Sequence, residues 1–453
     1  MVGQRVVVMG AARSGIAAAL LLAERGAHVT LTDLRPRLND ADDTTRLRHS
    51  GVELEVGGHV PETLARASLI VLSPGVPLSQ PALAAARRAA VPIVGEVEIA
   101  SRWLRGRIVA VTGTKGKSTT TTLTGRMLDA GGIRTLVGGN IGTPLSAQVA
   151  TSTPDTIHVV EVSSFQLETI QTFHPWIAVL LNFSPDHLDR HATVDEYASA
   201  KARIFENQDE RDWVVINADD PEALALARAA RGRRLQFSAN PSLTEGVVLL
   251  PGALTYRHAG QDEPLIPLSA VKVIGRHLLA DVAAAAAAAK LSGVSSADMT
   301  RAVESFRGLE HALELVAEVR SVRFVNDSKA TNVESALRAI ESFGEGLVVI
   351  LGGRYKGGDF GQLRAPLVAR GAKVIAIGEA RPLLREALGP AVPVSEATSL
   401  SEAVRQAYEH AKPHGTVLLA PACSSFDMFV DYADRGRTFK REVVLLETES
   451  RRL

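Results

Sequence analysis

The stretch Ile108-Val-Ala-Val-Thr-Gly-Thr-Lys-Gly-Lys-Ser-Thr119 decides the fold class of this chain. A short apolar run ends in a glycine-rich turn, after which a lysine and a hydroxyl residue begin a helical segment. Backbone N–H groups freed by Gly113 and Gly116, together with the amino end of the helix, form a cradle for anionic oxygens. Such a loop joins a buried parallel strand to a helix, so the sequence predicts an α/β fold.

Side chains in this loop have predicted tasks. Lys117 is expected to reach the β- and γ-phosphates of ATP, and the Ser118 hydroxyl is placed to ligate Mg²⁺. The general pattern has a glycine five residues before Gly116, where this chain has Val111. The loop is therefore a shortened variant in which Gly113 carries the turn. Because an ordinary glycine turn does not explain lysine and serine directly after Gly116, we predict ATP binding.

Strand-like segments recur along the chain, each followed by a glycine turn and a helical stretch rich in alanine and leucine. They are Arg5–Met9, His28–Thr32, Ser68–Leu72, Ile108–Thr112, His158–Val162, Ile177–Leu181, Trp213–Ile216, Leu347–Leu351, Lys373–Ile377 and Thr416–Leu419. Continuous apolar strands that alternate with helices indicate parallel sheets covered on both faces.

The 453 residues suggest three domains, at about 150 residues per domain. We predict an α/β protein with an N-terminal Rossmann-like domain (1–106), a central domain with the phosphate loop in a parallel sheet (107–308) and a C-terminal Rossmann-like domain (309–453).

Composition excludes several classes of protein. With 46% hydrophobic residues the chain can build cores, which excludes a largely disordered protein. Fifty Lys and Arg residues balance fifty Asp and Glu residues, which argues against a protein dedicated to nucleic acid or to a membrane surface. A single cysteine, Cys423, excludes an intramolecular disulfide and fits a reducing cytoplasm. Because no long apolar segment predicts a membrane span or a signal peptide, we expect a cytoplasmic enzyme.

A second glycine turn, Gly10-Ala-Ala-Arg-Ser-Gly15, follows the first predicted strand, and Asp33 ends the second. This resembles the dinucleotide-binding fingerprint, but its middle glycine is replaced by Ala12. In the fingerprint that glycine allows a pyrophosphate to approach the backbone closely. The turn alone leaves open a nucleotide-diphosphate site, an NAD site or plain packing.

Polar residues of the central segment are ambiguous by themselves. Glu161 follows a predicted strand, where a Mg²⁺ ligand is needed near a phosphate loop, but a surface carboxylate fits equally well. His187 and His191 stand four apart, as a helical zinc pair would, yet no HExxH pattern or cysteine cluster supports zinc. Lys201 lies on a predicted helical face of small residues, where a lysine is normally solvated.

Several segments together resemble the Mur ligases of peptidoglycan synthesis. They are Gly113–Thr119, Glu161–Leu167, Leu181–Arg190, Asn326–Asn332, Ser73–Gly75 and Pro421–Asp427, and they span all three predicted domains. The resemblance implies an ATP-dependent amide ligase that adds D-glutamate to UDP-N-acetylmuramoyl-L-alanine through an acyl phosphate, releasing ADP and phosphate. It also implies a cytoplasmic monomer whose partners are these small molecules, without nucleic acid or a membrane span.

The resemblance further implies tasks for individual residues. ATP would contact Gly113, Thr114, Lys115, Gly116, Lys117, Ser118, Thr119 and, at the ribose, Asp327. Mg²⁺ would be held by Ser118, Glu161, His187 and Lys201, the last carbamylated by CO₂ and thereby converted from an ammonium to an anion. The uridine part of the substrate would contact Arg13, Ser14, Leu34, Arg35, Ser73, Gly75 and Asn140. D-Glutamate would be held by Lys329, Thr331, Lys356, Ser425 and Tyr432. The candidate catalytic residues are Lys201, His187 and Lys356, with His187 either a base or a metal ligand.

The chain departs from the family pattern at three places. Lys115 replaces the usual Asn of the phosphate loop, and Ala312 replaces an Arg that helps to hold ATP phosphates. The stretch His277-Leu-Leu-Ala-Asp281 stands where the family's His-Asn-x-x-Asn contacts adenine. We hypothesise that Lys115 supplies the positive charge that Ala312 lacks.

Three alternative functions remain open. A folylpolyglutamate-type ligase or another Mur ligase is the first, although Asn326–Asn332 and Pro421–Asp427 argue against it. An NTPase switch would hydrolyse ATP without any amino acid. An NAD-dependent oxidoreductase would rest on Gly10–Gly15 and would change the nicotinamide absorbance on mixing with substrate.

Overall fold

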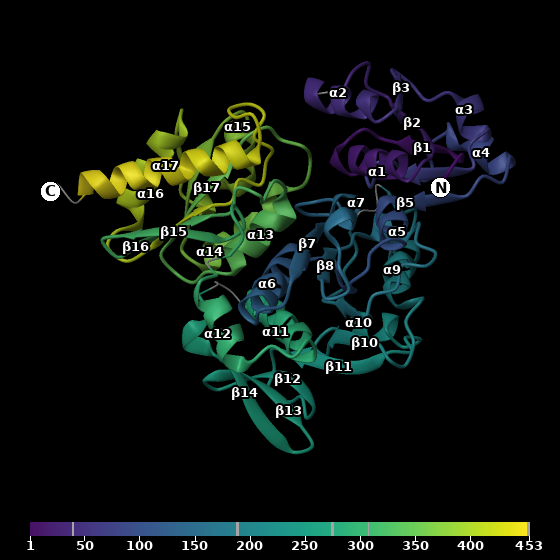
Figure 1. Ribbon diagram of the computed structural model, residues 1–453. Helices are drawn as coiled ribbons and strands as arrows, with labels where there is room; N and C mark the ends of the chain where they lie inside the picture. The colour runs from purple at the N-terminus through teal and green to yellow at the C-terminus, as the bar shows by residue number, and fades with distance from the viewer. Residues whose placement is uncertain (39, 187–189, 273–275, 307, 451–453) are drawn as a thin grey trace. The chain divides into compact units, whose positions relative to one another are not determined.

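The computed structural model describes residues 1–38, 40–186, 190–272, 276–306 and 308–450. It contains three β-sheets covered by helices, one sheet in each predicted domain (Figure 1). The chain forms two compact units, of which the first comprises Met1–Ala270 and Leu279–Val303 and the second Val271–Leu278 and Glu304–Leu453. The first two sheets belong to the first unit and the third sheet to the second. The predicted fold class, α/β with three domains, is confirmed.

The first sheet has five parallel strands in the order β3-β2-β1-β4-β5. The strands are β1 (Arg5–Met9), β2 (His28–Asp33), β3 (Glu53–Val56), β4 (Leu69–Leu72) and β5 (Ile93–Gly95), and the helices are α1 (Arg13–Glu24), α2 (Ala41–His49), α3 (Pro61–Ala65), α4 (Leu83–Arg88) and α5 (Glu96–Ser101). Successive residues of β1 alternate between two buried clusters, because neighbouring side chains of a strand point to opposite faces. The strand order reverses at β1 and β4, where α/β sheets of this kind bind ligands.

The second sheet has nine strands in the order β14-β13-β12-β11-β10-β9-β6-β8-β7. The strands are β6 (Arg107–Thr112), β7 (Thr135–Gly139), β8 (Ile157–Glu161), β9 (Ile177–Leu180), β10 (Trp213–Asn217), β11 (Arg233–Ser238), β12 (Gly246–Leu250), β13 (Ala253–His258) and β14 (Gln261–Pro267). The helices are α6 (Lys117–Ala130), α7 (Leu145–Gln148), α8 (Ser164–Leu167), α9 (Val194–Ala202), α10 (Pro221–Leu226), α11 (Arg276–Leu291) and α12 (Ser296–Glu304). β6, which leads into the phosphate loop, lies between β8 and β9 in the interior of the sheet.

The central sheet is parallel, as predicted, except at one edge. β13 and β14 run antiparallel to their neighbours, and Figure 1 shows them with β12 at the lower end of the sheet. The turn between β13 and β14 consists of Ala259 and Gly260, whose φ angles are +52° and +74°. Positive φ at both central residues is what a two-residue hairpin turn requires, so this turn sets the antiparallel pairing.

The third sheet has six strands in the order β15-β16-β20-β17-β18-β19, all parallel except β15. The strands are β15 (Glu314–Val319), β16 (Val322–Asn326), β17 (Leu347–Gly352), β18 (Lys373–Ile377), β19 (Val394–Glu396) and β20 (Thr416–Leu419), and the helices are α13 (Val333–Glu341), α14 (Arg364–Ala369), α15 (Arg381–Leu388), α16 (Leu400–Ala411) and α17 (Tyr432–Ser450).

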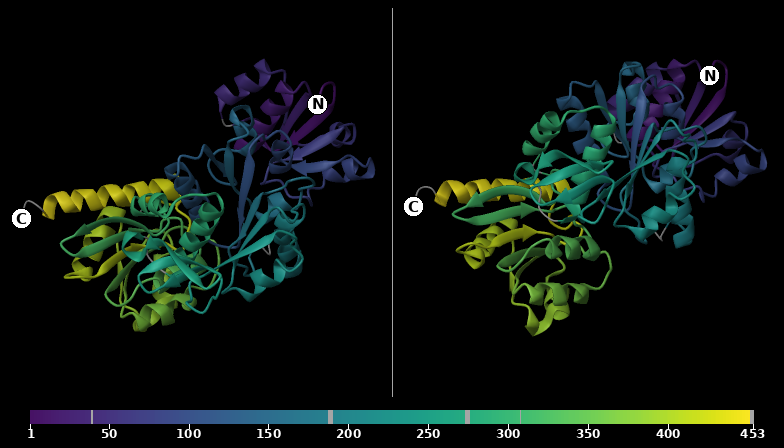
Figure 2. Two further views of the ribbon diagram at one scale, coloured as in Figure 1. Left: turned by 60° about the horizontal axis from the view of Figure 1, so that its bottom comes forward. Right: turned by 90° about the horizontal axis from the view of Figure 1, so that it is seen from below.

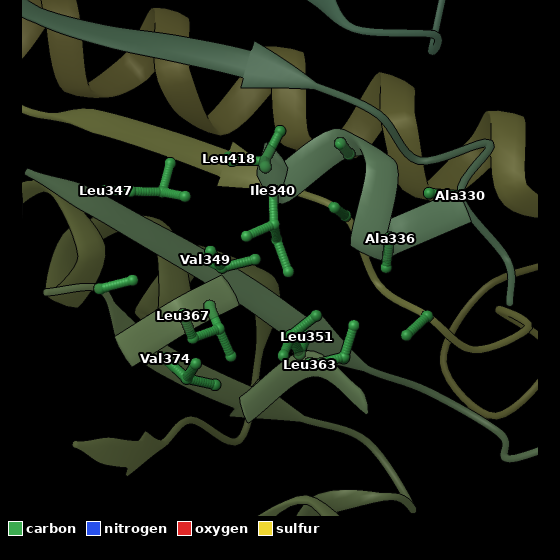
Figure 3. Close-up of a cluster of buried hydrophobic side chains, with 14 of the residues drawn as sticks. Ala330, Ala336, Ile340, Leu347, Val349, Leu351, Leu363, Leu367, Val374 and Leu418 are labelled. Atoms are coloured by element: carbon green, nitrogen blue, oxygen red, sulfur yellow. The ribbon is translucent and has the colours of Figure 1, made fainter. Parts of the chain in front are cut away.

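Apolar side chains cover both faces of the third sheet. On one face Ile340 of α13 and Leu367 of α14 pack with Val349, Leu351 and Leu418 (Figure 3). On the other face α16 and α17 pack together, and α17 is the long yellow helix in both views of Figure 2. Within the part of the chain that the structure describes, no helix is both long and apolar enough to cross a membrane.

Candidate active site

The phosphate loop connects the end of β6 to the first turn of α6. Gly113 and Gly116 have φ angles of +151° and +82°, which glycine adopts without the strain of a side chain. A Cβ atom at Gly113 would lie 3.0 Å from the Cβ of Leu181, and one at Gly116 would lie 2.1 Å from Oδ1 of Asp281. Among the described residues no side chain caps α6, so the N–H groups of its first turn are available to an anion.

Asn182, to which sequence reasoning gave no separate task, holds the loop in shape. Its Oδ1 accepts hydrogen bonds from the backbone N–H groups of Thr114 (3.1 Å) and Lys115 (2.9 Å), and its Nδ2 donates to the carbonyl of Lys115 (3.1 Å). Asn182 follows β9, the neighbour of β6, so the sheet order brings it to the loop. Its place directly after a predicted strand was the available signal in the sequence.

Two lysines meet at the carbonyl of Gly113. Lys117 Nζ donates to the carbonyls of Gly113 and Thr114, both at 3.0 Å, and Lys201 Nζ of α9 donates to that of Gly113 at 2.7 Å. Lys201 is 1% exposed. Burial, and then the charge of Lys117, lower the pKa of Lys201 to about 6 against the opposing effect of Asp186. At neutral pH the Lys201 side chain is therefore mostly a neutral amine.

Glu161 presents an unsatisfied oxygen at the end of β8. Its Oε1 accepts a hydrogen bond from Asn140 Nδ2 at 2.8 Å, whereas its Oε2 is buried without a hydrogen-bond partner among the described residues. A buried carboxylate oxygen without a partner is costly, and a cation would satisfy it. Glu161 and the Ser118 hydroxyl therefore fit a hard, oxygen-seeking cation such as Mg²⁺.

Of the two histidines in this segment, the predicted ligand His187 lies outside the described residues. His191 is buried, and both of its ring nitrogens have partners in the protein: Nε2 lies 3.0 Å from Ser164 Oγ and Nδ1 3.2 Å from Glu168 Oε1. Neither nitrogen is left for a metal, so a zinc pair with His187 does not fit.

Lys115 and Asp281, two of the residues that depart from the family pattern, both lie at the phosphate loop. Lys115 Nζ forms an ion pair with Asp186 Oδ2 at 3.2 Å. Asp281 is 4% exposed, and burial raises the pKa of its carboxyl group to about 8. Asp281 therefore carries a proton at neutral pH and adds little negative charge beside the cradle.

The candidate residues for the uridine part lie at the carboxyl ends of the first sheet's strands. They are Arg13 and Ser14 at the start of α1, Leu34 and Arg35 after β2, and Ser73 and Gly75 after β4. The hydroxyl of Ser73 donates to the carbonyl of Gly10 at 2.8 Å, which ties the turns after β4 and β1 together. The seventh candidate, Asn140, instead lies beside Glu161 in the second sheet.

The pairing of Asp33 argues against an NAD site. Both oxygens of Asp33 accept hydrogen bonds from the Arg35 guanidinium, at 2.8 and 2.9 Å, and Oδ2 also accepts from the N–H of Ala11 at 2.6 Å. Arg35 holds the pKa of Asp33 well below its usual range. The carboxylate that would bind a ribose in the NAD fingerprint is thus already engaged.

The remaining candidates lie together in the second unit, on loops at one edge of the third sheet. Asp327, Lys329 and Thr331 follow β16, Lys356 follows β17, Ser425 follows β20 and Tyr432 begins α17. Because β16, β20 and β17 are parallel neighbours, their carboxyl ends meet at this edge. Asp327 Oδ1 accepts from the N–H of Leu313 at 3.1 Å, and burial raises the pKa of Asp327 to about 7 despite the charge of Lys329.

Arg435, which sequence reasoning missed, joins two of these loops. It is 1% exposed and donates from Nη2 to the carbonyls of Ser328 (3.0 Å) and Cys423 (3.1 Å). Its Nε donates to the hydroxyl of Ser328 at 3.0 Å. No local pattern around Arg435 signalled this role, because the contacts join segments far apart in the sequence.

Comparison with protein families identifies the chain. The Mur ligase MurD-like N-terminal domain matches residues 4–95, the Mur ligase middle domain matches residues 111–289, and the Mur ligase glutamate ligase domain matches residues 313–423. The chain belongs to the Mur ligase family. The resemblance indicated by the sequence motifs is confirmed.

Close relatives in the Mur ligase family span nearly the whole chain. The UDP-N-acetylmuramoylalanine–D-glutamate ligase of Acidobacterium capsulatum is 46% identical over 440 residues, covering 97% of this chain and 95% of the relative. The enzyme of the same name from Geobacter metallireducens is 44% identical over 450 residues, 99% of each chain.

Solved structures of Mur ligases share the fold. The ligase MurF from Thermotoga maritima, in complex with ADP, has a TM-score of 0.59 at 15% identity and covers 98% of this chain and 96% of its own. The UDP-N-acetylmuramate-alanine ligase MurC from the same organism has a TM-score of 0.58 at 18% identity, covering 97% and 99%.

Because the carboxyl of Asp281 is buried, we expect the folding stability of the protein to fall as the pH rises, and we expect Asp281→Asn to remove this dependence. The pKa of this carboxyl rises from 3.8 to about 8 on folding, so stability falls as the pH rises through this interval, because the unfolded chain releases a proton that the folded chain keeps. Each pKa unit corresponds to about 1.4 kcal/mol, so we expect the variant to gain up to a few kcal/mol over the wild type between pH 5 and pH 8. Thermal unfolding measured across this range tests the prediction, with the exposed Asp195→Asn as control. A difference between Asp281→Asn and wild type that stays constant with pH would contradict it.

Proposed function

We propose that this chain is an ATP-dependent, ADP-forming ligase that joins D-glutamate to UDP-N-acetylmuramoyl-L-alanine during peptidoglycan synthesis. The observation that carries the proposal is the name shared by its relatives. Chains 41–46% identical to this one over 96–99% of its length are named UDP-N-acetylmuramoylalanine–D-glutamate ligase. The phosphate loop and the paired lysines support the use of ATP.

Each proposed domain has one task. Residues 1–106 would bind the uridine nucleotide part of the substrate, residues 107–308 ATP and Mg²⁺, and residues 309–453 the amino acid. The enzyme would act in the cytoplasm as a monomer, with these small molecules as its partners. The balance of charge supports the absence of nucleic acid among them.

The first chemical step activates a carboxylate, which does not react with an amine because its oxyanion is a poor leaving group. An oxygen of the substrate carboxylate attacks the γ-phosphorus of ATP, the bond to the β-phosphate oxygen breaks, and ADP leaves. The N–H groups of Gly116–Thr119 at the start of α6 and the ammonium of Lys117 would hold the phosphates in line. Mg²⁺, which Ser118 and Glu161 would hold together with His187 and carbamylated Lys201, supplies further neutralisation of the phosphate charge.

In the second step the neutral amine of D-glutamate attacks the acyl carbon. The tetrahedral intermediate expels phosphate, and the nitrogen loses a proton to a base, a role that His187 would take in place of holding Mg²⁺. Lys329 and Lys356 would hold the carboxylates of D-glutamate as ion pairs, with hydrogen bonds from Thr331 and Ser425 and contact with Tyr432. Closure of the third domain would keep water from the acyl phosphate.

Lys201 is suited to carbamylation because only a neutral amine reacts with CO₂. The nitrogen lone pair attacks the carbon of CO₂, a C–N bond forms, one C=O electron pair moves to oxygen, and a proton leaves the nitrogen for solvent. A pKa of about 6 keeps most of the side chain in the reactive form at neutral pH. The product is an anion at a position where an ammonium would repel Lys117 and Mg²⁺.

Dependence on the amino acid tests the proposed function. We expect ADP release in the presence of UDP-N-acetylmuramoyl-L-alanine to require D-glutamate and to be at least about a hundredfold slower with L-glutamate, a difference of about 2.7 kcal/mol. Coupled measurement of ADP with both enantiomers checks this, and Lys117→Ala serves as the inactive control. If ADP is released as fast without any amino acid as with D-glutamate, an NTPase switch would be favoured instead.

Carbamylation of Lys201 has a spectroscopic test of its own. With ¹³C-labelled bicarbonate we expect a ¹³C carbamate resonance from the wild-type protein at pH 8 and a much weaker one at pH 5, where a group of pKa about 6 is mostly protonated. The resonance should vanish in Lys201→Met and persist in Lys290→Met, a control in which the lost ammonium paired with Glu263 at 2.7 Å. A resonance that persists in Lys201→Met would refute the assignment.

A further inference from the structure

Arg190 bridges the first two sheets of the first unit. Its Nη1 donates to the carbonyl of Pro74 at 3.1 Å and its Nη2 to the carbonyl of Val76 at 3.0 Å. The guanidinium carbon also lies 4.1 Å from the centre of the Phe165 ring in α8. A single side chain therefore joins the loop after β4 of the first sheet to the helix that follows β8 of the second.

The loop held by Arg190 carries candidate residues for the nucleotide. Residues 73–76, here called the nucleotide loop, include Ser73 and Gly75, and the N–H of Val76 donates to the carbonyl of Ser73 at 3.0 Å. A Cβ at Gly10 would lie 2.9 Å from Val76, so the nucleotide loop packs against the first glycine turn. The cavity beside Arg190, about 10 Å³, has room for about one water molecule, so Arg190 packs closely against the nucleotide loop.

Neighbours of Arg190 in the sequence are tied to the reaction centre. Asp186 pairs with Lys115 of the phosphate loop at 3.2 Å. His191, directly after Arg190, contacts Ser164 and Glu168 at 3.0 and 3.2 Å. Asp186, which pairs with the phosphate loop, and Arg190, which binds the nucleotide loop, are therefore only four positions apart in the sequence.

We propose that Arg190 is a positioning residue that sets the nucleotide loop at the distance from the phosphate loop that the uridine substrate spans. The inference rests on the proposed function, because the substrate must present its carboxylate to the γ-phosphate while its nucleotide is held elsewhere. The planar guanidinium matches two carbonyls and an aromatic face at once, whereas a lysine ammonium offers a single point of attachment. Loss of Arg190 therefore weakens nucleotide binding without touching ATP.

Arg203 provides a matched control. It also donates from its guanidinium to backbone carbonyls, with Nη1 3.0 Å from Leu167 O and Nη2 2.7 Å from Ile170 O, but it forms no hydrogen bond with the nucleotide loop. Both arginines anchor backbone within the same unit, so a general loss of stability should appear in both variants. Only the contact of Arg190 leads to the nucleotide loop.

The test is calorimetric titration of UDP-N-acetylmuramoyl-L-alanine into the full chain without ATP, alongside steady-state KM values and thermal unfolding. For Arg190→Ala and Arg190→Lys we expect the Kd and KM of the nucleotide substrate to rise at least tenfold. The KM for ATP should stay within about twofold. In Arg203→Ala both substrate constants should stay within about twofold at a comparable Tm.

The outcomes separate this inference from the proposed function. If Arg190→Ala binds the nucleotide substrate as tightly as the wild type, or if Arg203→Ala weakens it equally, the positioning role is refuted while the function stands. If Arg190→Lys binds the nucleotide substrate as tightly as the wild type, the planar guanidinium is not needed and the proposal fails. If the wild type binds the nucleotide substrate but forms no amide with D-glutamate, the proposed function fails and the comparison of Arg190 with Arg203 still decides the positioning role.

Discussion

The candidate active site depends on the hydrogen bonds that two lysines donate to the carbonyl oxygen of Gly113. This oxygen accepts hydrogen bonds from both Lys117 and Lys201, at 3.0 and 2.7 Å, in a site where Lys201 is almost completely buried. Two ammonium groups so close together and shielded from water repel one another, so burial and Lys117 leave Lys201 mostly neutral. The loop keeps one fixed cation for phosphate and gains one nucleophilic amine. Conversion of that neutral amine to a carbamate would place an anion beside the Lys117 cation.

The other side chains near this carbonyl lie at or after the carboxyl ends of parallel strands. Asn182 after β9 shapes the phosphate loop, and Glu161 at the end of β8 presents an unsatisfied buried oxygen. Arg190 fixes the nucleotide loop after β4. The chain has no net charge, yet Lys117 and Lys201 meet at one carbonyl of the phosphate loop and Lys115 pairs with Asp186 beside it. Local imbalance of charge, rather than the total, accounts for the chemistry proposed here.

The sequence predicted the parallel strands well because each is a continuous apolar run bounded by turn residues. Arg5–Met9 was predicted and found without change, and Ile108–Thr112 lacked only Arg107. The antiparallel edge was missed although the pairs Pro251-Gly252 and Ala259-Gly260 mark turns, because β14 begins with polar residues and contains two prolines, which argue against a strand. The roles of Arg190 and Arg435 could not be predicted, since their partners are distant in sequence and any surface arginine has the same local pattern. The pairing of Arg35 with Asp33 lay within two residues and could have been anticipated. The tasks proposed for Lys201 and for the D-glutamate residues came from the family resemblance, not from residue spacing.

Transfer of the γ-phosphate of ATP to a substrate carboxylate, before the amide forms, is the step that the phosphate loop is proposed to support. The direct measurement uses UDP-N-acetylmuramoyl-L-alanine labelled with ¹⁸O in its carboxylate, together with ATP and D-glutamate. Attack of that carboxylate on the γ-phosphorus places one labelled oxygen in the phosphate that the amine later expels. We expect one ¹⁸O in each molecule of inorganic phosphate, measured by mass spectrometry, and none in the adenine nucleotide. Unlabelled phosphate, or label in AMP, would contradict it.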